Sequence, residues 1–125
     1  MRILTPGFVN RYLGKLINIH PSLLPKYQGL HTHKRALEAG DAEHGATVHF
    51  VTPELDGGPS IIQGAVSIEA SDDESSLAQK VQKDIEHHIY PLAVQWCLEK
   101  RVQLSEQGVI LDGELMPSCG FKYQA

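Results

Sequence analysis

The sequence predicts a mixed α/β fold in a single domain. Short runs of β-forming apolar residues alternate along the chain with longer stretches whose apolar residues recur about four positions apart. The length of 125 residues corresponds to one domain, and no internal repeat or linker-like tract divides the chain. We therefore expect residues 1–125 to form one domain in which a sheet is flanked by helices.

The first elements are a short helix and a strand. Thr5 followed by Pro6 has the form of a helix start, and the helical spacing of the residues that follow predicts a helix as far as Gly14. The apolar run at 16–20 predicts a strand, which Pro21 ends because proline removes a backbone donor.

A connection and a second helix follow. Residues 21–30 contain two prolines and a glycine, and a connection of this length in a compact domain is usually functional. Residues 32–40 then predict a helix that ends at Gly40, since glycine is the usual residue after a helix terminus.

Two further runs predict a pair of strands. Residues 47–51 and 61–68 have strand character, and the turn-forming sequence Asp-Gly-Gly-Pro at 56–59 lies between them. We expect these two strands to pair.

The last part of the chain predicts helices and a hairpin. Acidic residues at 72–74 favour a helix start, and apolar residues follow four positions apart as far as Ile89. Pro91 should break or kink this helix, and a second helix is expected from 92 to 102 with Pro91 in its first turn. Residues 109–116 around Asp112-Gly113 predict a terminal hairpin.

Composition argues against several classes of function. The formal net charge is -4, from 11 basic and 15 acidic residues, which argues against nucleic acid as a partner. The apolar runs are far shorter than the roughly 20 residues that cross a bilayer, and the N-terminus lacks the pattern of a signal peptide. We expect a cytoplasmic protein without a membrane partner.

Asn18, His20 and Asp56 are the candidate catalytic residues. Asn18 and His20 are two positions apart on a predicted strand, so their side chains should share one face at its C-terminal end. A nearby carboxylate from Asp56 would raise the pKa of the imidazole, and amide and imidazolium donors together can stabilise an oxyanion during acyl transfer. The alternative is structural: a core histidine, a capping asparagine and a turn-forming aspartate.

Seven histidines also raise the question of a metal site. His31 and His33 alternate on an extended segment, and His44, His49 or the pair at 87–88 could supply further ligands. The chain contains no thiolate cluster, no His-Glu-x-x-His sequence and no acidic calcium loop. We therefore expect no metal.

Several segments resemble one family. They are NIHPSLLPKY at 18–27, GLHTH at 29–33, GATVHFV at 45–51 and LDGGP at 55–59. Through these four segments the chain resembles the glycinamide ribonucleotide formyltransferases of the formyltransferase superfamily over nearly its full length. Related formyl-folate enzymes share part of this pattern, whereas the Leu-His-Thr-His stretch separates this family from the methionyl-tRNA formyltransferases and the formyltetrahydrofolate hydrolases.

The resemblance implies a reaction and the residues that perform it. The reaction would transfer a formyl group from 10-formyltetrahydrofolate to the amine of glycinamide ribonucleotide in purine synthesis, without a metal. Asn18 and His20 would hold the oxyanion, His20 would donate a proton, and Asp56 would raise its pKa. Glu86 would lie near the ribose of the nucleotide. The folate-contacting positions would be Met1, Arg2, Ile3, Leu4, Asn18, Thr52, Pro53, Glu54, Leu55 and Asp56.

The resemblance also implies that the chain is the C-terminal part of the fold. Members of the family begin with a βα unit whose Gly-rich turn binds the nucleotide phosphate, and no such segment precedes Met1. We expect an incomplete Rossmann-like formyltransferase fold, with a mixed sheet that lacks the N-terminal βα units. An uncovered sheet edge would favour a complementary N-terminal segment or self-association. The alternatives are a folate-binding fragment that needs such a segment, and a formyltetrahydrofolate hydrolase.

Overall fold

The structure is a computed structural model that describes residues 17–24, 26–51, 59–117 and 120–123. The helix expected from Thr5 to Gly14 lies outside the described residues, and so do residues 56–58 of the expected turn.

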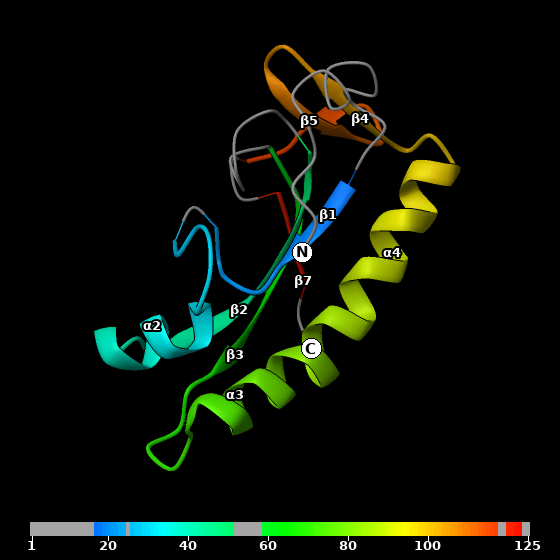
Figure 1. Cartoon of the computed structure of the whole chain (residues 1–125). Helices are drawn as coiled ribbons and strands as arrows, with labels where there is room; N and C mark the ends of the chain where they lie inside the picture. Colours follow the sequence, from blue (N-terminus) through cyan, green and yellow to red (C-terminus); the bar gives the residue numbers. More distant parts are fainter. Residues whose placement is uncertain (1–16, 25, 52–58, 118–119, 124–125) are drawn as a thin grey trace.

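The main sheet has four described strands and is mixed (Figure 1). Its strand order is β1-β2-β3-β7, in which β1 pairs antiparallel with β2, β2 antiparallel with β3, and β3 parallel with β7. The strands are β1 (Ile17–His20), β2 (Glu43–Phe50), β3 (Ser60–Ser67) and β7 (Phe121–Tyr123). The predicted strand at 16–20 and the predicted pairing of the two central strands are confirmed, whereas β7 was not predicted.

Strand β2 begins four residues before the predicted start at residue 47, because Glu43 to Ala46 also pair with β3. Glycine and alanine are weak strand formers, so the sequence pattern did not predict this part of the strand. Gly45 is required there by the close approach of β3: a Cβ atom on it would lie 1.8 Å from the carbonyl oxygen of Gly64.

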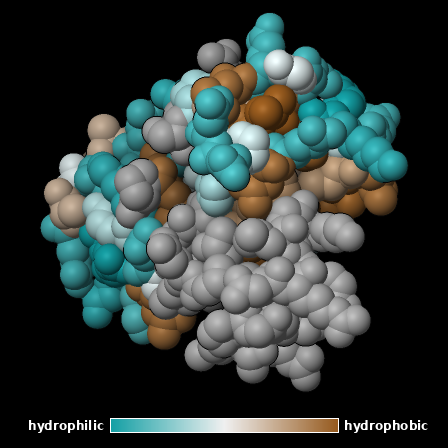
Figure 2. Space-filling model, turned by 90° about the horizontal axis from the view of Figure 1, so that it is seen from above, coloured by the Kyte–Doolittle hydropathy of each residue, from teal (hydrophilic) through white to brown (hydrophobic). Residues whose placement is uncertain are grey.

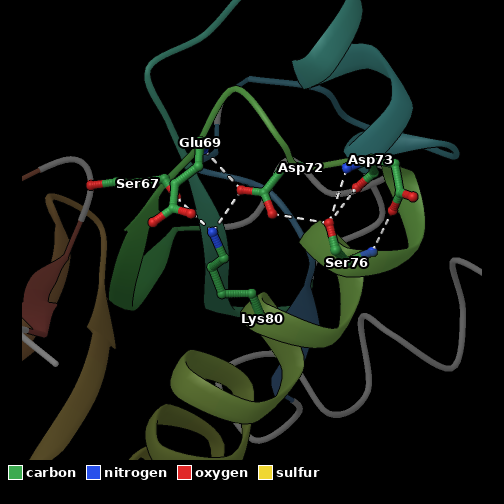
Figure 3. A network of polar contacts seen from close by, with 6 residues as sticks. All are labelled: Ser67, Glu69, Asp72, Asp73, Ser76 and Lys80. Carbon is green, nitrogen blue, oxygen red and sulfur yellow. Dashed lines mark hydrogen bonds and ion pairs between the residues drawn. The ribbon is translucent and has the colours of Figure 1, made fainter.

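Helix α2 (Thr32–Ala39) confirms the second predicted helix, and Gly40 ends it in the left-handed conformation. Helix α3 (Glu74–Val81) begins at a capping box, in which the Asp73 carboxylate accepts from the Ser76 backbone N–H and the Ser76 hydroxyl oxygen accepts from the Asp73 N–H. Figure 3 shows the network that continues from this cap: the Lys80 ammonium donates to the Asp72 carboxylate at 2.6 Å and to the Ser67 carbonyl.

The helix does not break at Pro91. Helix α3 runs directly into a π-helical turn, η1 (Gln82–Glu86), and then into α4 (His87–Leu98), which contains Pro91. Of the two predicted outcomes, a break or a kink, the break with a restart at residue 92 was wrong, while the helical stretch does change direction along its length (Figure 1). The π turn lies one turn before Pro91.

A second sheet follows α4. Its strands are β4 (Val102–Ser105), β5 (Gly108–Leu111) and β6 (Glu114–Leu115), in the order β4-β5-β6. The hairpin predicted around Asp112-Gly113 is confirmed by β5 and β6, but the helix ends at Leu98 and not at residue 102, where β4 begins. The surface at this end of the molecule mixes hydrophilic and hydrophobic residues (Figure 2).

The two faces of the main sheet differ in chemistry. Strand alternation and the cross-strand register place Ile19, Val48 and Ile62 on one face, towards the helical stretch from α3 to α4. The opposite face carries His20, Thr47 and Gln63. The buried hydrophobic cluster joins the first face to the helices and the second sheet; its members are Ala46, Val48, Phe50, Ile61, Ile62, Leu77, Val81, Ile85, Ile89, Ala93, Trp96, Val102, Val109 and Leu111.

Candidate active site

Asn18 and His20 lie on the same face of β1, as the sequence predicts. Asn18 is opposite His49 and His20 is opposite Thr47 in the antiparallel pairing of β1 with β2. The Oδ1 atom of Asn18 accepts a hydrogen bond of 2.9 Å from the Ile19 backbone N–H. This bond holds the amide oxygen against its own strand.

The His20 ring is buried and oriented by a backbone carbonyl. Its side chain is 2% exposed, and its Nε2 atom lies 2.7 Å from the carbonyl oxygen of Tyr27. A carbonyl oxygen only accepts hydrogen bonds, so Nε2 carries the proton of this contact. In the neutral ring, this contact favours the tautomer that carries its proton on Nε2.

Tyr27 reaches this position through an uncommon backbone conformation. It has a φ of 55°, in the left-handed region that non-glycine residues rarely occupy. Its hydroxyl donates to Asp41 at 2.5 Å, and the Arg35 guanidinium lies 5.1 Å from its ring centroid. The hydrogen bond to Asp41 raises the pKa of the Tyr27 hydroxyl, and the same bond lowers the pKa of Asp41.

A second pair of histidines lies beyond Tyr27. His44 Nε2 is 3.1 Å from His33 Nδ1, and the two rings meet edge to face at 5.0 Å. Burial, with a smaller contribution from neighbouring His33, lowers the pKa of His44 to about 4, and burial also lowers the pKa of His33. Both rings are therefore neutral at pH 7. The described part of the chain contains no group of three or more residues that could hold a metal.

Glu86 lies on the other face of the sheet. It lines a cavity of about 320 Å³ together with Ile19, Gln82, His87, Tyr90 and Pro91. Ile19 alternates with Asn18 and His20 along β1, so this cavity opens on the face opposite to theirs. Burial raises the pKa of the Glu86 carboxyl, which the charges of His87 and His20 counteract.

The remaining predicted site residues cannot be placed. Asp56 lies outside the described residues, and so do the folate-contacting positions at 1–4 and 52–55. The structure therefore brings together Asn18 and His20 and places Glu86 across the sheet. The structure also places Tyr27 in the candidate site. Because Tyr27 contacts His20 through its backbone carbonyl, the pattern of side chains in the sequence could not predict this role.

Comparison with known proteins identifies the family. A model of the formyl transferase family matches residues 1–94. The chain is 54% identical over 121 residues to phosphoribosylglycinamide formyltransferase from Escherichia coli, an alignment that covers 97% of this chain and 57% of the enzyme. The chain belongs to the formyl transferase family.

Solved structures give the same result. The phosphoribosylglycinamide formyltransferase from Coxiella burnetii is 46% identical, with a TM-score of 0.94 over 99% of this chain and 58% of that one. A formyltetrahydrofolate deformylase from Pseudomonas syringae is more distant, with 32% identity and a TM-score of 0.83 over 89% of this chain and 37% of that one. The chain therefore spans just over half the length of the formyltransferases that it matches.

This similarity confirms the mixed formyltransferase fold and the predicted family. Among the described residues, no helix is long and apolar enough to cross a membrane.

Proposed function

We propose that this chain carries the formyl-transfer chemistry of a phosphoribosylglycinamide formyltransferase. The reaction moves a formyl group from 10-formyltetrahydrofolate to the amine of glycinamide ribonucleotide. The similarity to enzymes of that name supports the reaction. The observation that carries the proposal is the placement of Asn18 and His20 on one strand face, with the His20 ring oriented by the Tyr27 carbonyl.

The proposed chemistry needs two donors and one proton carrier. When the substrate amine adds to the formyl carbon, the Asn18 amide and the protonated Nδ1 of His20 donate to the oxygen that becomes negative. His20 then passes its Nδ1 proton to the folate nitrogen as the carbon–nitrogen bond breaks, and the proton that the attacking amine releases returns His20 to its protonated form. Formyl glycinamide ribonucleotide and tetrahydrofolate result, and the proton count balances.

Asp56 would stabilise the protonated form of His20. Because Nε2 is committed to Tyr27, Nδ1 is the ring position that must serve the formyl oxygen. We therefore propose that the Asp56 carboxylate acts on the ring mainly through its charge, and not through a bond that would compete for Nδ1.

Glu86 and the folate-contacting segments complete the proposed site. The half-buried Glu86 lines a cavity beside β1 on the face opposite to Asn18 and His20, and we propose that the sugar of the nucleotide contacts it there. The positions proposed to contact folate are Met1, Arg2, Ile3, Leu4, Asn18, Thr52, Pro53, Glu54, Leu55 and Asp56. The proposal includes no metal and retains the cytoplasmic location expected from the sequence.

A second candidate is a folate-binding part that acts only with a complementary segment. The observation in its favour is that the chain spans 57% of the Escherichia coli enzyme. Strand β1 is an outer strand of the described part of the main sheet, and an outer strand can pair with a further segment or with a second copy of this chain.

An assay of formyl transfer, with and without an added N-terminal segment, distinguishes the two candidate functions. We would follow formyl transfer from 10-formyltetrahydrofolate to glycinamide ribonucleotide by the chain alone and after addition of the N-terminal part of the Escherichia coli enzyme. Turnover by the chain alone would refute the requirement for a complementary segment. Loss of the formyl group without nucleotide would support the hydrolase, and no transfer in either arm would contradict the proposed function.

Substitution of Asp56 tests its role in whichever preparation is active. We expect Asp56→Asn to lower the transfer rate about 100-fold, the usual scale for loss of one electrostatic contribution to an oxyanion. Asp112→Asn is a matched control, because Asp112 also precedes a glycine in the sequence but lies between β5 and β6 of the second sheet. Equal rates for the two variants would contradict the role of Asp56.

A further inference from the structure

The chain that leaves β1 folds back on His20 without forming a helix or strand. The Ser22 backbone N–H donates to the His20 carbonyl at 2.8 Å, and the Lys26 N–H donates to the Leu23 carbonyl at 3.1 Å. This return brings the Tyr27 carbonyl to the His20 ring. The backbone carbonyls of an irregular connection need hydrogen-bond donors from other parts of the chain, and side chains of other elements donate to several of these carbonyls.

Thr47 holds the first half of this connection against β2. Its hydroxyl donates to the Ser22 carbonyl at 2.8 Å and accepts from the Leu24 backbone N–H at 3.2 Å. The same oxygen accepts from Gln63 Nε2 at 3.0 Å. The hydroxyl is fully buried and uses its one donor and both acceptor positions, so its orientation is fixed.

Gln63 ties the same segment to β3. Its Nε2 group donates to the Leu24 carbonyl and to Thr47 Oγ1, each at 3.0 Å. An amide nitrogen has two N–H donors, and this geometry uses both. Gln63 therefore joins three pieces of chain, β3, β2 and the connection, at the point nearest to the buried end of β1.

The second half of the connection is held from α2 and the residues after it. Arg35 Nη1 donates to the Gln28 carbonyl at 2.7 Å, and the Tyr27 hydroxyl donates to Asp41. At the start of the connection, Thr32 donates to the Pro21 carbonyl, beside the residues that Thr47 and Gln63 hold. The position of the Tyr27 carbonyl thus depends on anchors at both ends of the connection.

We propose that Gln63 and Thr47 are positioning residues that set the tautomer of His20. They hold the segment 22–24 on the sheet, which keeps the Tyr27 carbonyl on Nε2 and favours the Nε2–H form of the neutral ring. The role of this tautomer in catalysis rests on the proposed function. The tautomer itself is a property of the free chain and is measured without any substrate.

The test is ¹⁵N NMR of the histidine rings in the whole chain at a pH where His20 is neutral. In the unchanged chain we expect the Nε2–H form of His20 to exceed the Nδ1–H form by about tenfold, the factor that one ordinary hydrogen bond supplies. Gln63→Met keeps the side-chain length and removes both donors. In this variant we expect the two forms of His20 to differ in population by no more than about twofold.

Three further variants make the result specific. Thr47→Ser keeps the hydroxyl and should show the same ratio of His20 forms as the unchanged chain. Thr47→Val removes the hydroxyl and should show the same decrease in this ratio as Gln63→Met. Gln103→Met changes an exposed glutamine of β4 and should have no effect. The ring signals of His33 and His44 report in the same spectra whether the rest of the domain keeps its fold.

The outcomes decide the proposal. A loss of the His20 preference in Gln63→Met and Thr47→Val, with unchanged His33 and His44 signals, supports the positioning role. An unchanged His20 ratio in both variants overturns it, and so does a change that spreads equally to all three histidines. Since no substrate is present, these results are independent of whether formyl transfer is observed.

Discussion

The two faces of the main sheet are held by different forces. On the helix side, Val48, Phe50 and Ile62 pack into a buried apolar cluster with the helical stretch. On the other side, Thr47 and Gln63 hold an irregular segment through directed hydrogen bonds, and the ring of His20 lies within it. The comparison teaches that one face supplies stability through buried area, while the other supplies the orientation of a few polar groups.

The largest expected effect lies on the apolar face. Phe50 is 1% exposed, and Phe50→Ala should lower the free energy of unfolding by about 4 kcal/mol through lost burial and the cavity left behind. Urea denaturation measures this loss. Phe121, whose side chain is 43% exposed, is the matched control, and Phe121→Ala should cost clearly less. Equal costs would contradict the assignment of Phe50 to the core.

The next effect concerns the buried His44, which joins the sheet to α2. Its pKa of about 4 in the fold lies below the ordinary value of 6.5, so the unfolded chain binds the extra proton more readily. Stability should therefore fall as pH decreases from about 6.5 to about 4, by up to about 3 kcal/mol, and this contribution should stay constant below that range.

Urea denaturation at a series of pH values measures this slope. His44→Gln removes the titrating ring and can still donate to His33, so it should flatten the curve between pH 6.5 and pH 4. A slope of the same size in the variant would show that other groups cause it.

A smaller loss of stability is expected on the polar face. Gln63→Met removes two hydrogen bonds but keeps most of the packing, so the free energy of unfolding should fall by about 1 kcal/mol. The same urea titration compares it with Phe50→Ala. A cost as large as that of Phe50→Ala would erase the distinction between the two faces.

The smallest effect is expected at the start of α3. The hydrogen bond from Lys80 holds the pKa of Asp72 at about 2, below its ordinary value of 3.8. A depressed carboxyl pKa stabilises the fold above about pH 4, and this contribution is lost as pH falls towards 2. Asp72→Asn should therefore lower the thermal unfolding midpoint at pH 7 but not at pH 2, and an equal shift at both values would contradict this reason.

The same contrast explains how much the sequence could predict. Apolar periodicity reports directly on the buried face, so the central strands, α2 and the start of α3 were predicted close to their observed positions. Strand β7 was missed because three residues give too short a pattern. The break expected at Pro91 was wrong, since the chain stays helical through a π turn and past the proline, and a π turn leaves no trace in the periodicity.

The candidate site was only partly accessible to sequence reasoning. The spacing of Asn18 and His20 predicts a shared face, which the strand pairing confirms. The roles of Gln63 and the Tyr27 carbonyl depend on segments up to 39 positions apart in the chain, and no local pattern reports such contacts. Asp56 stays a prediction.

The most direct test of the account is the protonation state of the two ring nitrogens of His20 in the unchanged chain. ¹⁵N NMR at a pH where the ring is neutral should show the proton on Nε2, bonded to the Tyr27 carbonyl, with Nδ1 unprotonated. A proton found on Nδ1, or an equal mixture of the two forms, would contradict the claim that the polar face fixes this ring for proton transfer.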